Sequence, residues 1–413
     1  MSKNITIGMF GFGVVGHGLV DIIQSKTFNL SIKKIVIKHP EKKRTLPAEL
    51  FTTDARAVLD DPEINTVVEL INDADAAFSI VKEALQKGKN VVSANKKMIA
   101  EHLEELVELQ HEHGASLLYE GAVCGSIPII RNLEEYYDNE LLYEVSGIFN
   151  GSSNYILSKV FNDNLSYAAA LKEAQDLGFA ETDPTLDVGG FDPKYKLAIA
   201  AAHAYGTFIR PQEILNIGID TLSAHDLQYA REKGWKIKLV PTVRKIDDEQ
   251  IALYVLPRFV KPGDLLYQVE NEFNGVIVQA AFAERQFFYG KGAGGHPTGA
   301  AVLSDIMALR YDYHYEYKKA LQTSKVQFSN EPVLDVYLRY SDENLPSEIG
   351  FLSVNEQFSS PTHKYLTGTV HLKNLIAARD RILSARAFIA ATPRSVATHV
   401  PDAVLDELTG FSG

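Results

Sequence analysis

The chain has 413 residues, more than one hydrophobic core usually supports, so two or three domains are expected. Hydrophobic residues make up 46% and charged residues 23%, and the net charge of -12 argues against nucleic acid as the main partner. The single cysteine, Cys124, excludes an intramolecular disulfide framework and fits a reducing cytosol. The sequence has no signal-peptide pattern and no apolar run of roughly 20 residues. We therefore expect a cytoplasmic protein without a membrane span.

The N-terminal part alternates short apolar strands with helical stretches. The predicted strands lie at 3–10, 33–38, 65–71, 90–93 and 116–119, and predicted helices follow the turn at 11–18 and occupy 76–87 and 97–113. Gly88 and Gly114 end the last two helices, because glycine adopts a positive φ at little cost. This alternation is typical of βαβ crossovers and a parallel sheet. It predicts a doubly wound (Rossmann) α/β domain over residues 1–130.

Beyond residue 131 the pattern changes. Strands are predicted at 146–149, 236–244, 251–258 and 275–283, and helices at 153–161 and 166–177. A third helix runs to about residue 205, with Asp192 as its N-cap and Pro193 as its first residue. The glycine-rich stretch 286–298 precedes an apolar helix, at about 298–320, that completes the first domain. Residues 131–297 are thus expected to form an α+β domain with an open sheet.

The remaining residues form a third, smaller region. Strands are predicted at 333–339, 366–372 and 387–391, with a helix at 373–384. This pattern predicts a small α+β unit within residues 321–413.

A glycine motif lies between the first strand and the first helix. Its residues are Gly11, Phe12, Gly13, Val14, Val15 and Gly16. Gly11 permits the turn, Gly13 lets the backbone approach a pyrophosphate, and Gly16 allows close packing of the helix. The phosphates would bind free N–H groups at the positive end of the helix dipole. The motif favours dinucleotide binding, although a glycine-rich turn without a ligand is the alternative.

The end of the second strand bears on the choice of dinucleotide. An NAD-selective site usually has an acidic residue there, which binds the ribose 2′-hydroxyl. This chain instead has Lys38-His39-Pro40, and the cations Lys42, Lys43 and Arg44 follow. Cations suit a 2′-phosphate, so the sequence favours NADP over NAD. The alternative is that these residues form a solvated surface loop.

The densest group of ionisable residues lies at 180–196. It contains Glu181, Asp183, Asp187, Asp192 and Lys196. Asp192 and Lys196 are four residues apart and therefore share one helix face. The carboxylates can hold the ammonium of an amino acid, and the lysine can exchange a proton with a reacting oxygen. On the residues alone, a calcium-like loop or a merely capped loop is an equal alternative.

Two further ionisable residues follow strands of the predicted parallel sheet. Lys96 follows Val92-Ser-Ala-Asn95, and Glu120 ends the next strand, at the edge where doubly wound sheets bind ligands. Lys96 would supply the second cation that a proton-exchanging lysine needs, although each residue alone is equally a surface charge. The sequence has no His/Cys metal spacing, Walker loop or serine elbow, so phosphoryl and acyl transfer have no support.

Together, these segments resemble the homoserine dehydrogenase family. The resemblance rests on Gly-Phe-Gly-Val-Val-Gly at 11–16, Ser-Ala-Asn-Lys at 93–96, Tyr-Glu-Gly-Ala-Val-Cys-Gly-Ser-Ile-Pro-Ile-Ile at 119–130, Gly-Ile-Phe-Asn-Gly-Ser-Ser-Asn-Tyr-Ile-Leu at 147–157, and 178–201 with its Ala-Glu-Thr-Asp-Pro. Gly-Lys-Gly-Ala-Gly-Gly-His-Pro-Thr at 290–298 looks like the family's second nucleotide-contacting loop. The resemblance covers about residues 5–310, and the motifs at 147–201 are its most specific part.

The resemblance implies reversible NAD(P)-dependent hydride transfer between L-homoserine and L-aspartate 4-semialdehyde, in threonine and methionine biosynthesis. It implies that Lys196 and Lys96 are the catalytic residues, with Lys196 as the proton donor and acceptor and Lys96 near cofactor and substrate. The substrate-binding residues would be Glu181, Asp187, Asp192 and Lys96. The cofactor-binding residues would be Gly11, Phe12, Gly13, Val14, Val15, Gly16, Lys38, Asn72, Lys96 and Gly292. Backbone oxygens of Glu120, Val123, Gly125 and Ile127 would bind a monovalent cation (Na or K), and the sheet of the second domain would form a homodimer.

Two departures from the family pattern matter. Many members have a Gly-Gly turn and a proline where this chain has Asn72 and Asp73, so the acidic Asp73 is expected to affect nicotinamide placement or coenzyme preference. The C-terminal region resembles an ACT domain but has Ser341-Asp-Glu-Asn-Leu-Pro346 in place of the usual turn. A response to threonine is therefore not predicted. The competing hypotheses are another amino-acid or semialdehyde reductase and a catalytically silent dinucleotide-binding regulator.

Overall fold

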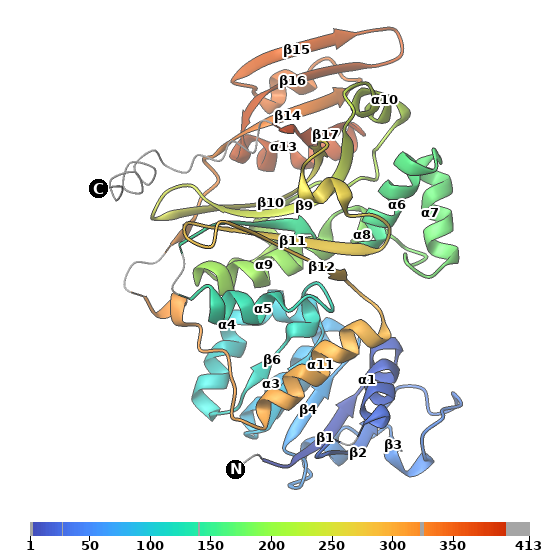
Figure 1. The fold of residues 1–413 in the computed structure, drawn as a ribbon, viewed down its shortest axis with the longest axis vertical. Helices are drawn as coiled ribbons and strands as arrows, with labels where there is room; N and C mark the ends of the chain where they lie inside the picture. The colour runs from blue at the N-terminus through green and yellow to red at the C-terminus, as the bar shows by residue number, and fades with distance from the viewer. Residues whose placement is uncertain (1–2, 27, 139–140, 323–325, 394–413) are drawn as a thin grey trace.

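The computed structural model describes residues 3–26, 28–138, 141–322 and 326–393. These residues build a six-stranded sheet and an eleven-stranded sheet, drawn one above the other in Figure 1. Within the described ranges no helix has both the length and the apolar character needed to span a bilayer.

The N-terminal sheet is parallel throughout, with the order β3-β2-β1-β4-β5-β6. Its strands are β1 (Ile5–Phe10), β2 (Leu30–Val36), β3 (Phe51–Thr52), β4 (Thr66–Glu69), β5 (Asn90–Ser93) and β6 (Leu117–Leu118). Its helices are α1 (Val14–Ser25), α2 (Arg56–Leu59), α3 (Ala74–Gln86) and α4 (Lys96–His113). The doubly wound fold is confirmed, and its switch point, where strand order reverses, lies between β1 and β4.

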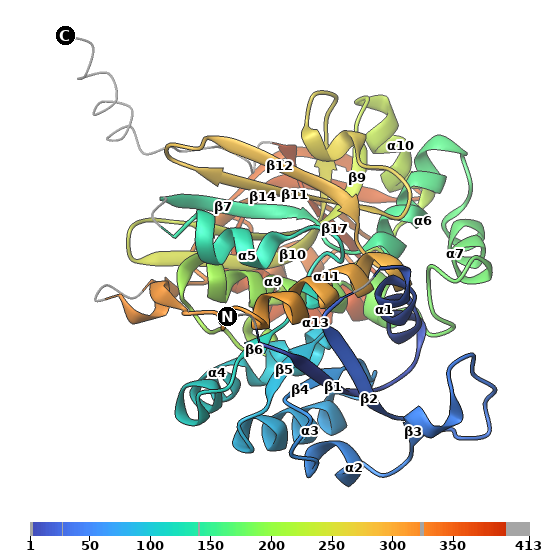
Figure 2. The ribbon, with the colours of Figure 1, turned by 60° about the horizontal axis from the view of Figure 1, so that its bottom comes forward.

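Helix α11 (Gly295–Leu309) returns to this domain from far along the chain and lies beside α1 in both Figure 1 and Figure 2. Glycines permit the contact: a Cβ on Gly18 would lie 2.2 Å from the Gly295 carbonyl carbon, and one on Gly299 would lie 2.7 Å from the Leu19 nitrogen. The helix begins slightly earlier than expected and ends at Leu309 rather than near residue 320.

The second sheet begins with β12-β11-β7-β9-β10. These strands are β7 (Leu142–Ile148), β9 (Lys236–Lys245), β10 (Gln250–Val260), β11 (Phe273–Ala280) and β12 (Arg285–Lys291). Helices α6 (Gly151–Asn162), α7 (Tyr167–Asp176), α8 (Thr185–Val188), α9 (Phe191–Tyr205) and α10 (Ala224–Glu232) belong to the same domain. Strand β12 was not predicted because it overlaps the glycine-rich stretch 286–298, but Arg285–Lys291 pairs antiparallel with β11. Helix α9 lies between this sheet and the nucleotide domain (Figure 1).

The C-terminal region continues the same sheet. Its elements are β14 (Val333–Tyr340), α12 (Leu345–Ile349), β15 (Ser353–Ser359), β16 (Lys364–His371), α13 (Leu372–Ser384) and β17 (Phe388–Ala391). This is a ferredoxin-like β-α-β-β-α-β order with strand order β17-β14-β16-β15, of which α12 and β15 were not predicted. Arg258 of β10 pairs with Ala391 of β17. Leu215 and Ile217 share a hydrophobic core with this region. The similarity to an ACT domain stays a prediction.

Candidate functional site

The glycine motif forms the expected strand–turn–helix. Gly11 has φ +92°, and a Cβ there would lie 2.7 Å from the Leu70 carbonyl oxygen. Gly13 is the N-cap of α1, and a Cβ on it would meet nothing within 4 Å, which leaves room for a ligand. A Cβ on Gly16 would lie 3.1 Å from the Gly11 oxygen, so glycine there lets α1 pack closely against the turn after β1. The contact of α1 with α11 depends on a different residue, Gly18.

A cavity of about 650 Å³ lies beside this turn. Its lining includes Gly11, Phe12, Gly13, Lys38, His39, Lys42, Arg44, Asn72 and Asp73. Arg44 is braced there: its guanidinium donates hydrogen bonds of 2.6 Å to the carbonyl oxygens of Lys42 and His39 and lies 5.2 Å from the centre of the Phe51 ring. Lys38, His39, Lys42 and Arg44, which follow β2, therefore line a cavity at the nucleotide turn.

Asp73 has a structural task at the start of α3. One of its carboxylate oxygens accepts hydrogen bonds from the Asp75 and Ala76 nitrogens at 3.1 and 3.0 Å, so it is the helix N-cap. Asn72 lines both this cavity and the one described next. The end of β4 therefore borders both cavities.

The carboxylate of Asp192 lies between two lysines. Lys96 Nζ is 2.7 Å from one of its oxygens, and Lys196 Nζ is 2.8 Å from the other. Lys196 also donates a 2.7 Å hydrogen bond to the Phe149 carbonyl oxygen at the end of β7. Lys196 is buried, whereas the Lys96 side chain is 41% exposed. Residues predicted separately from the starts of α4 and α9 thus meet at one carboxylate.

The prediction that Asp192 caps α9 is wrong. The N-cap is Gly190, with φ +79°, and Asp192 lies within the first turn. Its carboxylate binds the two lysines and Asn150 rather than the helix N–H groups.

Asn150 was missed by the sequence analysis. Its Nδ2 donates hydrogen bonds to Asp187 at 2.7 Å and to Asp192 at 2.9 Å, and its Oδ1 accepts one from the Ser153 nitrogen as the N-cap of α6. Its position just before a predicted helix, in the motif at 147–157, was the available signal. Asn150 holds two like-charged groups close together.

The charges of these groups depend on one another. Burial alone would raise the pKa of the Asp192 carboxyl, but Lys196 and Lys96 hold that pKa well below its ordinary value. The charge of Asp192 in turn raises the pKa of Lys96 against the effect of burial. Burial, followed by the charge of Asp192, raises the pKa of Asp187. The site therefore contains an ionised carboxylate that two lysines share.

Lys96, Asp187, Asp192 and Lys196 form a lysine–carboxylate cluster, and the first three of them line a cavity of about 320 Å³. Its lining includes Ile71, Asn72, Asn95, Lys96, Glu181, Asp183, Leu186, Asp187, Asp192 and Tyr195. Glu181 is exposed there, while Asp183 accepts hydrogen bonds from the Thr185 nitrogen and hydroxyl. One wall comes from the strand ends of the nucleotide domain and the other from α8 and α9. The cavity can accept a small polar molecule with an ammonium group.

The residues predicted to bind a cation follow β6. Glu120 begins a 3₁₀ turn, and its carboxylate accepts hydrogen bonds from the Ile130 and Arg131 nitrogens. Burial raises the pKa of Glu120 to about 8. Gly125, with φ +55°, packs against Gly292: a Cβ on Gly125 would lie 2.7 Å from the Gly292 carbonyl. Gly292 is thus buried against this turn.

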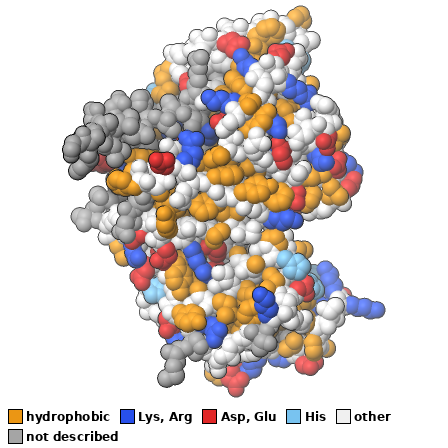
Figure 3. All heavy atoms as spheres, in the orientation of Figure 1, with side chains coloured by type: hydrophobic (Ala, Val, Ile, Leu, Met, Phe, Trp, Pro, Cys, Tyr) orange, Lys and Arg blue, Asp and Glu red, His pale blue; other side chains and the backbone are white. Residues whose placement is uncertain are grey.

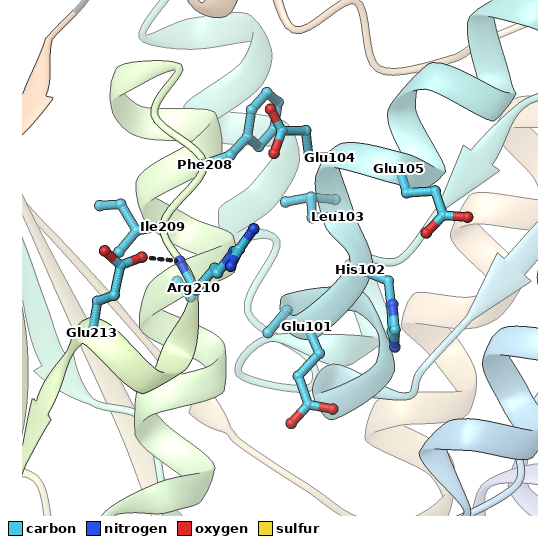
Figure 4. A pocket seen from close by; sticks show the side chains of 11 residues that line it. Glu101, His102, Leu103, Glu104, Glu105, Phe208, Ile209, Arg210 and Glu213 are labelled. Atoms are coloured by element: carbon cyan, nitrogen blue, oxygen red, sulfur yellow. Dashed lines mark hydrogen bonds between the residues drawn. The ribbon is translucent and has the colours of Figure 1, made fainter.

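A separate cavity of about 260 Å³ is lined by none of the predicted site residues (Figure 4). It lies between α4 and the segment 208–213, and Arg210 extends toward α4. The carboxylate of Glu105 pairs with Lys82 at 2.6 Å, and that of Glu101 lies 4.0 Å from Lys97. These acidic groups are engaged on the surface of α4.

Comparisons with known proteins agree with this geometry. The family model described as "Homoserine dehydrogenase, NAD binding domain" matches residues 11–120, and the one described as "Homoserine dehydrogenase" matches 128–307. A homoserine dehydrogenase of Bacillus subtilis is 37% identical over 317 residues, which are 74% of this chain and 73% of that protein. The crystal structure of a homoserine dehydrogenase from Thiobacillus denitrificans has a TM-score of 0.81 at 28% identity, covering 94% of this chain and 98% of that one. A hyperthermophilic archaeal homoserine dehydrogenase mutant in complex with NADPH has a TM-score of 0.65 at 25% identity, covering 76% and 99%.

Proposed function

Because this chain belongs to the homoserine dehydrogenase family, we propose that the cavity above Asp192 is its substrate site. The family consists of oxidoreductases that act on a CH–OH group and interconvert L-homoserine and L-aspartate 4-semialdehyde. The observation that carries the assignment is the single carboxylate of Asp192 shared by Lys96 and Lys196 beneath a cavity lined by further carboxylates.

Hydride transfer would be supplied by a nicotinamide held at the glycine turn, so the protein's own task is to handle the proton of the substrate oxygen. In the reductive direction, the ammonium of Lys196 donates a proton to the carbonyl oxygen as that oxygen becomes a hydroxyl. In the oxidative direction, its neutral amine takes the hydroxyl proton. The hydrogen bond from Lys196 to the Phe149 oxygen fixes the direction of Nζ. Lys96 holds the opposite oxygen of Asp192 and lines the proposed substrate cavity, and from there it would contact both cofactor and substrate.

The substrate ammonium would bind the remaining carboxylates. Glu181 and Asp187 line the cavity, and Asp192 forms its charged floor. An ammonium is attracted to this group, although each lysine offsets part of the negative charge.

The activity is tested by following the near-ultraviolet absorbance of the reduced nicotinamide, with purified protein and L-homoserine. We expect reduction of the cofactor, and none with L-serine or L-threonine. If neither homoserine nor aspartate semialdehyde is turned over while a cofactor still binds, the chain is a silent dinucleotide-binding regulator. Turnover of a different semialdehyde alone would favour the other reductase hypothesis.

The favoured coenzyme is NADP. Lys38, Lys42 and Arg44 line the cavity beside the nucleotide turn, and Arg44 is already held in place by two carbonyl oxygens. The NADPH complex of the archaeal relative supports this choice. The other proposed cofactor contacts are the glycine turn from Gly11 to Gly16, together with Asn72, Lys96 and Gly292.

Coenzyme preference is tested with Arg44→Gln. Loss of a charged hydrogen-bonding partner should lower kcat/KM with NADP about 10-fold and leave NAD little changed. Lys43→Gln is the matched control, because Lys43 belongs to the same basic run but does not line the cavity. An equal loss with both coenzymes would contradict a role at the 2′-phosphate.

A monovalent cation would bind the backbone oxygens of Glu120, Val123, Gly125 and Ile127. The compact turn after β6, with Cys124 and Gly125 both in the left-handed region, supports this proposal. Sodium or potassium chloride should then raise the melting temperature more than choline chloride at equal ionic strength. Equal shifts with all three salts would count against a specific cation.

We also infer a homodimer through the larger sheet. Hydrophobic side chains gather across the middle of the molecule in Figure 3, and Phe273, Ile277 and Phe287 of β11 and β12 are only partly buried. Tyr289 of the edge strand β12 is 53% exposed. Light scattering should give twice the chain mass, and Tyr289→Glu should shift it toward a monomer. A monomeric wild-type protein would overturn this inference.

A further inference from the structure

Asn216, at the end of the short strand β8 (Leu215–Asn216), joins three parts of the chain. It is 1% exposed. Its Nδ2 donates a 2.8 Å hydrogen bond to the Gly189 carbonyl oxygen, and its Oδ1 accepts one of 2.9 Å from Lys194 Nζ. Its backbone oxygen accepts a 3.0 Å hydrogen bond from Nε of Arg379, which lies on α13 of the C-terminal region. The C-terminal region therefore reaches the start of α9.

Arg379 and Lys194 also lie against the same aromatic ring. Lys194 Nζ is 4.8 Å and the Arg379 guanidinium carbon is 5.8 Å from the centre of the Phe191 ring, at the first residue of α9. Burial, together with the charge of Arg379, lowers the pKa of Lys194 to about 8. The ring attracts both cations, so the two contacts together restrain the position of Phe191.

The segment that these contacts hold carries the two aspartates proposed to bind substrate. Asp187 lies two residues before Gly189, and Asp192 directly follows Phe191. The same turn packs tightly against Gly218, since a Cβ on Gly218 would lie 1.8 Å from the Val188 oxygen. A small shift of this turn would move both carboxylates relative to Lys96, which is fixed to a different domain.

We propose that Arg379 is a positioning residue for the substrate site, acting through Asn216 and Phe191 on the turn that carries Asp187 and Asp192. Arg379 lies outside residues 11–120 and 128–307, which the family models match. The C-terminal region thus supplies part of the support of the substrate site in this chain. This inference rests on the proposed role of the two carboxylates in binding substrate.

Arg379→Gln in the full chain is the test. We expect KM for L-homoserine to rise about 5-fold. We expect kcat and KM for the coenzyme to stay within about twofold, because the nucleotide turn and Lys196 keep their contacts. Amide hydrogen exchange in residues 187–196 should become faster. Arg379→Lys, which keeps a cation beside Phe191, should recover part of the loss.

Arg381→Gln is the matched control. Arg381 lies two residues further along α13 and pairs only with Asp342 and Glu348 of the same region in the contacts described. It should leave KM and exchange at 187–196 unchanged. The inference is overturned if Arg379→Gln behaves like Arg381→Gln, or if it raises KM for substrate and coenzyme together with a loss of melting temperature. If the wild type oxidises no homoserine, the proposed function fails, whereas the exchange comparison still decides whether Arg379 holds this turn.

Discussion

The nucleotide turn and the lysine–carboxylate cluster are built in opposite ways. The turn is one contiguous segment, Gly11 to Gly16, and it offers backbone N–H groups and open space. The cluster collects side chains from the start of α4, the end of β7 and the segment 187–196. A backbone site depends on local conformation, whereas an ionic cluster depends on how two domains are placed. The two sites should therefore respond differently to substitution.

The energetic difference is equally clear. In the cluster, the buried Asp192 and Lys196 compensate each other's charge, and removal of Asp192 would leave Lys196 as a buried, uncompensated charge at a cost of about 3–5 kcal/mol. In the turn, glycine matters at position 13 because a side chain there would occupy the open space left for a ligand. Substitutions in the cluster should thus impair chemistry, and those in the turn should impair coenzyme binding.

Lys196→Ala should have the largest effect. If Lys196 exchanges the proton of the substrate oxygen, kcat should fall by roughly 100-fold or more, with coenzyme affinity largely kept. Steady-state kinetics and fluorescence titration with the reduced coenzyme measure the two quantities. Lys172→Ala, an exposed lysine on α7, is the control. Loss of coenzyme binding to the same extent would mean that the cluster has no separate chemical role.

Asn150→Ser should have the next largest effect. Serine retains an oxygen that can cap α6 but cannot reach both Asp187 and Asp192, so the two carboxylates would separate. We expect kcat/KM for homoserine to fall about 10-fold and the melting temperature to change little. Asn150→Ala, which removes the cap as well, should add a loss of stability of about 1 kcal/mol. Full activity of Asn150→Ser would show that the carboxylates need no bridge.

A comparison of Gly13→Ala with Gly18→Ala tests whether the nucleotide turn acts through ligand space rather than through helix packing. Alanine at position 13 meets open space, so we expect an intact fold and a KM for the coenzyme raised about 5-fold through contact with the pyrophosphate. Alanine at position 18 meets the backbone of α11 at 2.2 Å, so it should lower the melting temperature. Steady-state kinetics of both variants gives KM for the coenzyme, and thermal denaturation gives their melting temperatures. The reverse outcome would mean that Gly13 is a packing residue.

The smallest expected effect concerns Glu69, buried beneath the strand ends at which the two sites meet. Its carboxylate accepts hydrogen bonds from the Ile71 nitrogen and the Ser93 hydroxyl, and burial raises its pKa from 4.5 to about 7. Between these values the unfolded chain releases the proton and the folded chain keeps it. Stability contributed by this group is therefore full below pH 4.5 and falls by up to about 1.4 kcal/mol per pH unit until pH 7.

Glu69→Gln should remove that slope, because glutamine keeps both hydrogen-bonding positions and carries no proton to release. Urea denaturation of the wild type and the variant at several pH values between 5 and 8 measures it. Glu104→Gln, at an exposed position on α4, should leave the slope unchanged. An identical pH dependence of wild type and Glu69→Gln would contradict burial as the cause of the raised pKa.

Much of the fold followed from local pattern. Strand–helix alternation and the glycine motif predicted the parallel sheet, because periodicity and turn chemistry are local properties. Strand β12 was not predicted, and the start of α9 was predicted wrongly. The glycine-rich stretch 286–298 gave no strand pattern, although Arg285–Lys291 pairs with β11. In α9, the contacts of Asp192 with Lys96, Lys196 and Asn150 outweighed its preference for an N-cap.

The sequence by itself determined the nucleotide turn, the parallel α/β sheet that contains it, and the residue types of the proposed substrate site. Only the tertiary structure decided that Asp192 is shared by Lys96 and Lys196, that Asn150 bridges two carboxylates, and that Arg379 contacts the support of α9. The physical reason is separation along the chain: apart from Asp192 and Lys196, which share one helix face, these contacts join residues 37 to 163 positions apart. Packing of sheets and helices, rather than local preference, brings them together.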